Sequence, residues 1–171
     1  MANQFKTTNV SGTFTVNGVE IGASSGEAQA ALAQRAIRDM LGAPDDADGV
    51  IGGGQHTNIL KVSAQSSPDL TVQVGAGTCF VGGIFTGDND GVASLSGFAA
   101  PTTNPRIDIV QIDNTGAITR KAGTENASPS APAVDTDNLL LATVYCRVGM
   151  TSVKDADDAS NGYITDARVF V

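Results

Sequence analysis

Two apolar runs, Ile107–Ile112 and Leu139–Cys146, constrain the fold more than any other part of the chain. A turn signal, Asn114-Thr115-Gly116, follows the first run, and a short strand-like segment, Ala117–Lys121, follows the turn. A longer connection punctuated by prolines then leads to the second run. This order predicts a β-hairpin, a crossing loop and a returning strand.

The first run is apolar on both faces of the strand it predicts. In a simple pleat Ile107 and Ile109 face one way, whereas Val110 and Ile112 face the other. Either a β-bulge shifts this pattern or both faces are buried. Burial of both faces is natural for a central strand that a neighbouring subunit covers.

Further strand-like segments precede this stretch. Leu70–Val74 alternates apolar and polar residues, as in a strand with one solvated face. Three more segments follow it, with glycine turns between them: Thr78–Val81, Ile84–Thr86 and Val92–Leu95. A strand about every ten residues is typical of β-sandwiches and barrels. We therefore predict a mainly β fold, with a β-sandwich or barrel-like domain over residues 59–171.

The N-terminal residues 1–25 are polar and glycine-rich, and they predict an extended anchoring arm that carries one hairpin. Two short runs, Thr13–Val16 and Val19–Ile21, flank Asn17-Gly18, a pair that favours a two-residue turn. An isolated hairpin of this length is not stable in water. We expect the arm to lie against another protein, with a floppy tail as the open alternative.

Residues 26–42 predict one short helix. Ser24 or Ser25 can cap its start, Gly42 ends it, and Pro44 lies beyond. One seam of the helix has the spacing of a coiled coil and allows three helices to meet on an axis: Ala30, Ala33, Ile37 and Met40. A second apolar edge would let the helix lie on its own domain instead: Leu32, Ala36 and Leu41. Residues 43–58 predict a linker between the helix and the β domain.

Charge and composition exclude several classes of partner. The chain has 10 basic and 18 acidic residues, for a net charge of −8, and it shows no basic face for nucleic acid or anionic lipid. It contains no run of about 18 apolar residues that would span a membrane, and its first residues lack the apolar core of a signal peptide. Cys79 and Cys146 lie inside apolar runs, which predicts buried free thiols of a protein made in a reducing cytoplasm.

The sequence offers little for catalysis or for a cofactor. His56 is the one histidine, so neither a catalytic triad nor a zinc site is expected, and we predict no metal and no cofactor. The acidic segments Gly87–Gly91 and Lys154–Asp158 resemble turns more closely than calcium loops. A glycan site usually needs aromatic platforms, and the chain has no Trp and two tyrosines, Tyr145 and Tyr163.

The last third of the chain resembles a module that is common in tail-fibre and baseplate proteins of tailed bacteriophages. The resemblance rests on an ordered series of short segments: Arg106-Ile107-Asp108, Gly123-Thr124, Ser128-Pro129, Ala131-Pro132-Ala133, Leu139–Val144 and Val148-Gly149-Met150-Thr151-Ser152. The order is more specific than any single segment. The resemblance implies a virion structural protein, usually a homotrimer, with no catalytic residues to carry over.

These observations lead to one main expectation and to alternatives. The main expectation is a non-enzymatic, trimeric short tail-fibre or baseplate component, made in the bacterial cytoplasm and anchored in the virion through residues 1–25. The resemblance to trimeric proteins favours the intersubunit role of the helix. A head fibre or capsid decoration protein would have the same design. Another alternative is a receptor-binding module that grips a host-surface glycan through the loops Gly87–Gly91 and Asp155–Gly162, and an enzyme acting on polysaccharide is the least favoured.

Overall fold

The computed structural model describes residues 14–16, 19–21, 35–36, 39, 47–52, 58–88 and 90–171. The chain divides into two compact units, Met1–Ala43 and Pro44–Val171. In the first unit, β1 (Phe14–Val16) pairs antiparallel with β2 (Val19–Ile21), which confirms the predicted hairpin. Arg35, Ala36 and Asp39 are helical and exposed. The predicted seam residues lie outside the described part of the chain: Ala30, Ala33, Ile37 and Met40.

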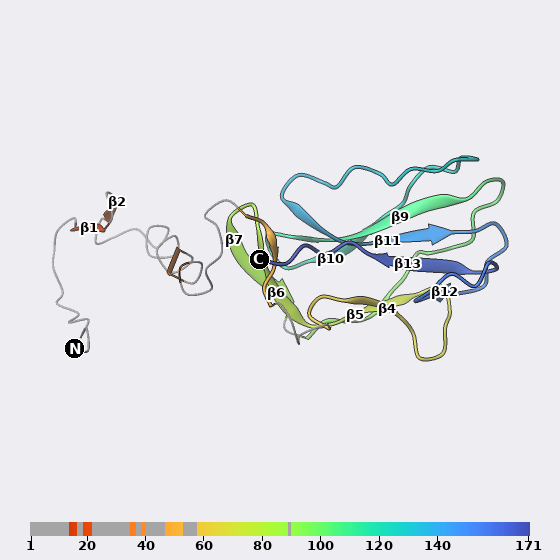
Figure 1. Ribbon diagram of the computed structural model, residues 1–171, viewed down its shortest axis with the longest axis horizontal. Coiled ribbons are helices and arrows are strands. Elements are labelled where there is room, and N and C mark those ends of the chain that lie inside the picture. Colours follow the sequence, from red (N-terminus) through yellow and green to blue (C-terminus); the bar gives the residue numbers. More distant parts are fainter. Residues whose placement is uncertain are drawn as a thin grey trace. The chain divides into compact units, whose positions relative to one another are not determined.

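The second unit is built on a five-stranded sheet with the order β10-β9-β11-β13-β12 (Figure 1). Its strands are β9 (Arg106–Asp113), β10 (Ile118–Lys121), β11 (Asn138–Cys146), β12 (Val153–Lys154) and β13 (Gly162–Asp166). β9 and β10 form a hairpin, and the chain then crosses over and returns as β11 on the other side of β9. This topology confirms the predicted hairpin, crossing loop and returning strand.

Two three-stranded sheets complete the unit, with the orders β4-β5-β8 and β3-β6-β7. The strands of the first are β4 (Val62–Ala64), β5 (Val72–Val74) and β8 (Val92–Leu95). Those of the second are β3 (Gly49–Val50), β6 (Gly77–Val81) and β7 (Ile84–Asp88). The fold is therefore mainly β, and the described strands form separate sheets rather than one closed barrel.

One apolar core lies between the five-stranded sheet and β4-β5-β8. In β5, Val72 and Val74 are buried whereas Gln73 is exposed, which is the alternation that the sequence predicts. Both sheets supply fully or almost fully buried residues to the core: Val62, Val72, Val74, Val110, Ile112, Leu141 and Val144. No helix in the described residues is long and apolar enough to cross a bilayer.

Part of the segment expected to be a linker, residues 43–58, belongs to this folded unit. Val50 is fully buried, its amide donates to the carbonyl of Val169 at 2.7 Å, and its carbonyl accepts from the amide of Val171 at 3.1 Å. A Cβ on Gly49 would lie 2.9 Å from the Val169 carbonyl oxygen, so the close approach of the two segments needs a glycine here. β3 therefore ties the end of the chain to the domain.

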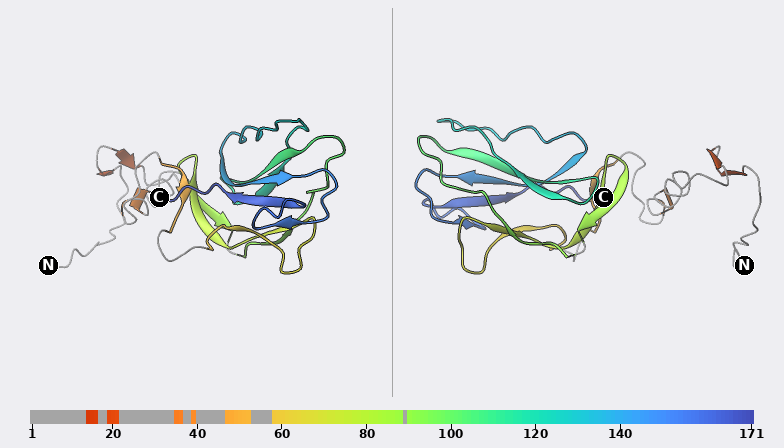
Figure 2. Two further views of the ribbon diagram at one scale, coloured as in Figure 1. Left: turned by 45° about the vertical axis from the view of Figure 1, so that its right-hand side comes forward. Right: turned by 180° about the vertical axis from the view of Figure 1, so that it is seen from behind.

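The central strand β9 is buried on both faces. Val110 contributes to the core, whereas Ile109, on the opposite face, is also fully buried. The chain itself supplies the second cover, because the connection between β10 and β11 runs along the side of the domain opposite β4 and β5 (Figure 2). It is fixed there by hydrogen bonds between the side chain of Gln111 and Asp135, at 2.5 and 3.1 Å. A neighbouring subunit is thus not needed to cover Ile109. A β-bulge is also present, on the partner strand β11 between Leu140 and Ala142.

Candidate functional site

An ionic cluster around Asp108 lies on β9 and the edge strand β10 of the five-stranded sheet. The Asp108 carboxylate has no exposed surface and accepts hydrogen bonds from Arg106 Nε at 2.8 Å and from Arg120 Nη2 at 2.7 Å. It also accepts from the Gly123 amide at 3.0 Å. Arg106 in turn donates to the carbonyl of Ala99 at 2.6 Å. The cluster therefore joins β9 and β10 to the segments on either side of them.

The protonation of this cluster suits a structural role. Burial alone would raise the pKa of Asp108, but the hydrogen bonds from Arg106, Gly123 and Arg120 outweigh burial and lower it. Asp108 therefore remains a carboxylate that is fully occupied by donors. Burial, together with the nearby Asp108, raises the pKa of the Cys146 thiol to about 12, and burial and the charge of Asp48 do the same for Cys79. Both thiols are free and buried, as the sequence predicts, and neither is activated as a nucleophile.

A second carboxylate fixes the loop that precedes β9. Glu125 accepts hydrogen bonds from the backbone amides of Thr102 at 2.9 Å, Thr103 at 2.9 Å and Asn104 at 3.2 Å. The amide of Asn126 donates to the carbonyl of Pro105 at 3.0 Å. Gly123 is thus bonded to Asp108, and the adjoining loop is bonded to the segment just before β9, so these residues form one hydrogen-bonded unit.

The environment of Glu125 predicts an unusual titration. The three amides lower the pKa of Glu125 to about 2, from its ordinary value of 4.5. A lowered folded-state pKa stabilises the protein above the ordinary pKa, and the contribution is lost as the pH falls through the folded pKa. We expect carboxyl ¹³C NMR to give Glu125 a midpoint near 2, and the stability gap between the parent and Glu125→Gln to close as the pH falls toward 2. A midpoint near 4.5 would contradict these contacts.

The loop Asp155–Gly162 uses its carboxylates for turns and for one link to β4. Asp158 accepts from the side-chain amide of Asn161 at 2.8 Å and from the backbone amides of Asn161 at 2.7 Å and Ser160 at 2.9 Å, which lowers its pKa to about 2. Asp155 accepts from the amide of Ala64 at 2.7 Å. Because these oxygens are turned toward amide donors, they do not converge on a common point, and the described residues contain no cluster suited to a metal ion. The turn interpretation agrees with this geometry.

The other acidic loop, Gly87–Gly91, has one carboxylate engaged and one not. Asp88 Oδ1 accepts from the amides of Asp90 at 3.0 Å and Gly91 at 2.8 Å, which is ordinary turn chemistry. Gly91 packs against the carbonyl of Val74, whereas Asp155 is bonded to Ala64, at the other end of the β4-β5 pair. The two loops expected to grip a glycan together are therefore attached to opposite ends of this pair.

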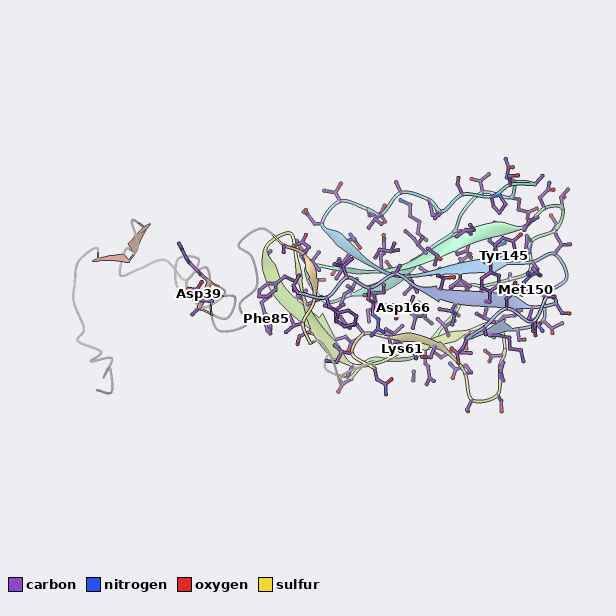
Figure 3. The ribbon with its side chains drawn as sticks, viewed as in Figure 1. Asp39, Lys61, Phe85, Tyr145, Met150 and Asp166 are labelled. Atoms are coloured by element: carbon purple, nitrogen blue, oxygen red, sulfur yellow. The ribbon has the colours of Figure 1, made fainter. Side chains whose placement is uncertain are left out.

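The two tyrosines lie together, although 18 positions separate them in the sequence. The register of β11 and β13 pairs Tyr145 with Tyr163, and their rings stack at 5.3 Å with an interplanar angle of 22°. The Arg147 guanidinium lies 5.2 Å from one ring centre and 5.3 Å from the other. Asp157 holds Arg147 in place at 3.0 Å. Figure 3 labels Tyr145 at the end of the sheet where Met150 also lies.

A groove of about 610 Å³ runs over the outer face of β4-β5-β8. Its polar lining comes from the turn before β4, from β4 and β5, and from the loop before β8: Asn58, Lys61, Ser63, Gln73 and Asp90. Val92 and Ala93 add apolar surface, whereas the Val74 side chain is buried in the core. Lys61 lies near Asp166 where β4 approaches β13 (Figure 3). No sequence pattern indicates this groove, because its lining residues are dispersed along the chain and individually ordinary.

His56, the residue on which a catalytic triad or a zinc site would depend, lies outside the described residues. Among the described residues, the Tyr145–Tyr163 pair and the polar groove are the candidate surfaces for a ligand. A search of protein-family models, curated proteins and solved structures finds no match to this chain.

Proposed function

We propose that this chain is a non-enzymatic structural protein of a tailed-bacteriophage virion, a homotrimeric short tail-fibre or baseplate component attached through residues 1–25. The alternative is a head fibre or a capsid decoration protein, which would have the same design but lie on the head of the particle. The observation that carries it is the hydrogen-bonded unit around Asp108. Three residues on which the resemblance to the phage module rests, Arg106, Asp108 and Gly123, are hydrogen-bonded to one another there.

In this proposal, one part of the chain attaches to the particle and the β domain is a different part. Residues 1–43 form a unit distinct from the β domain, and the hairpin of β1 and β2 is too short to be stable in water by itself. A partner protein that adds hydrogen bonds and apolar cover would complete it. Threefold symmetry would multiply the attachment, so that weak individual contacts give a lasting one. Mass spectrometry of purified particles from the source phage tests the proposal, and absence of the chain from them refutes it.

A trimer on the helical seam gives a prediction for residues 26–42. In Ile37→Asp, three carboxylates would meet near one axis, which is costly without partners. We expect the variant to be released as monomers while the parent remains trimeric, as measured by light scattering of the purified chain. Arg35→Asp, at a position exposed in this chain, is the matched control and should leave the parent mass unchanged. A trimeric Ile37→Asp would refute the axial helix.

A receptor-binding module remains the second candidate. The Tyr145–Tyr163 pair favours this function. Two tyrosines are few for a glycan site, but their stacked rings lie together and could form one aromatic platform. The loop Asp155–Gly162 adjoins the pair, since Arg147 donates to the Asn161 carbonyl at 2.8 Å. Binding of particles to host cells that is lost in Tyr163→Ala would support this function, whereas undiminished adsorption would remove the pair from it.

A further inference from the structure

We propose that the groove on β4-β5-β8 is a binding site for a neutral, hydroxyl-rich ligand of the size of a short oligosaccharide. The site is distinct from the Tyr145–Tyr163 pair and does not depend on the virion role proposed above. Its volume, about 610 Å³, lies within the range of small-molecule sites.

The first argument is that several polar groups of the groove have no hydrogen-bond partner among the described residues. Across residues 47–52, 58–88 and 90–171, Asp90 and Asp137 are the only acidic residues that accept no hydrogen bond and form no ion pair. Asp90 lines the groove. The side chains of Asn58 and Ser63 likewise bond to no described residue. Gln73 donates from Nε2 to the Ala64 carbonyl at 3.1 Å, which leaves its Oε1 available.

The second argument concerns the type of ligand that these groups fit. Amide, hydroxyl and carboxylate groups offer both donors and acceptors, and such a mixture matches neighbouring hydroxyl groups, each of which donates and accepts. The lining holds one cation, Lys61, and one anion, Asp90. A strongly anionic ligand would face Asp90 and a cation would face Lys61, so the balance favours a neutral molecule. Val92 and Ala93 provide apolar contact for the C–H surface of a sugar ring.

The third argument is that the groove is preformed. Its floor is an antiparallel ladder in which Ser63 is paired with Gln73, and the Gly75 amide donates to the Lys61 carbonyl at 2.9 Å. A Cβ on Gly75 would lie 2.3 Å from the Asn58 carbonyl oxygen. A Cβ on Gly91 would lie 2.5 Å from that of Val74. These close backbone approaches fix the wall of the groove, so a ligand would not have to order it on binding.

The test is a titration of the full ¹⁵N-labelled chain with maltotriose, chitotriose and a mannose trisaccharide, with inorganic phosphate as the anionic comparison. We expect at least one trisaccharide to give saturable amide shifts at Gly75, Gly91 and Ala93, and phosphate to give none. Asp90→Ala should weaken that binding about tenfold, and Gln73→Ala several-fold, since each removes a hydrogen-bonding group at the ligand.

The matched control is Thr165→Ala, which removes a similarly exposed polar group on β13, outside the groove. It should bind as the parent does, and unchanged amide spectra away from the groove would show that all variants are folded. The proposal is overturned if no trisaccharide in the panel gives saturable shifts at these amides, if the shifts map to Tyr145 and Tyr163, if phosphate competes, or if Asp90→Ala binds normally. None of these results bears on trimer mass or on the presence of the chain in particles.

Discussion

Asp108→Asn is expected to lower the free energy of unfolding by about 3–5 kcal/mol, the range found when one partner of a buried ion pair is removed. Asn has nearly the same shape as Asp, so the loss would come from charge rather than from a cavity. Arg106 and Arg120, whose side chains are 10% and 18% exposed, would be left without their shared carboxylate. The Gly123 amide would also face a weaker acceptor. Chemical denaturation at neutral pH measures the effect.

The control for this prediction is Lys121→Gln, which breaks an ion pair with Asp135 in which the two side chains are 37% and 51% exposed and leaves the hydrogen bonds between Gln111 and Asp135 in place. An exposed pair contributes about 0–1 kcal/mol, so the control should remain close to the parent. The lowered pKa of Asp108 adds a dependence on pH: its contribution is present above the ordinary pKa of an aspartate and is lost as the pH falls through its lower folded value. The difference between Asp108→Asn and the parent should therefore shrink in acid. An equal loss of unfolding free energy in the two variants would mean that the buried contacts of Asp108 with Arg106, Arg120 and Gly123 do not stabilise the domain.

Local signals were enough to predict most strands of the β domain. Asn114-Thr115-Gly116 marked the turn between β9 and β10, and the alternation at Leu70–Val74 identified the buried face of β5. Such signals act over a few residues, so they place strands and turns without saying which sheet a strand joins. The pairing of Val50 with the end of the chain spans about 120 positions, and the apparent linker around it carries no strand pattern. It was therefore missed.

The segment that covers the second face of β9 also could not be predicted from local sequence signals. The pattern Ile107–Ile112 correctly indicated two buried faces, but a neighbouring subunit was the natural candidate for the second cover. The actual cover is a polar, proline-rich connection that is fixed by Gln111 and Asp135, and its composition reads as an exposed loop. Burial by a loop that has no strand or helix of its own leaves no periodic signal.

The candidate sites were harder to predict than the strands. Tyr145 and Tyr163 were visible as the two tyrosines, but their stacking depends on the register between β11 and β13, which the sequence does not specify. For the groove, the informative feature is a hydrogen-bond acceptor that stays unused at Asp90, and this can be recognised only when the partners of the other acidic residues are known. Asp88 and Asp90, two residues apart, look alike in the sequence and differ in this respect.

Deletion of residues 1–25 is expected to abolish incorporation into virions while leaving the β domain folded. The hydrogen bonds and core contacts described for the domain lie within residues 47–171, and the chain divides into compact units at Ala43 and Pro44. The truncated chain should therefore unfold at nearly the parent temperature. The truncated chain would lose the hairpin of β1 and β2. We propose that a partner protein adds hydrogen bonds to the strands of this hairpin.

The measurement is complementation of a phage lacking the gene, followed by quantitative mass spectrometry of purified particles. Thr119→Ala, an exposed substitution on β10, serves as the control and should be incorporated at the parental level. Because each subunit of a trimer would lose its attachment at once, the truncated chain should fall below detection rather than to an intermediate occupancy. Parental occupancy of the truncated chain would place the attachment in residues 26–171 and would remove the arm from the proposed function.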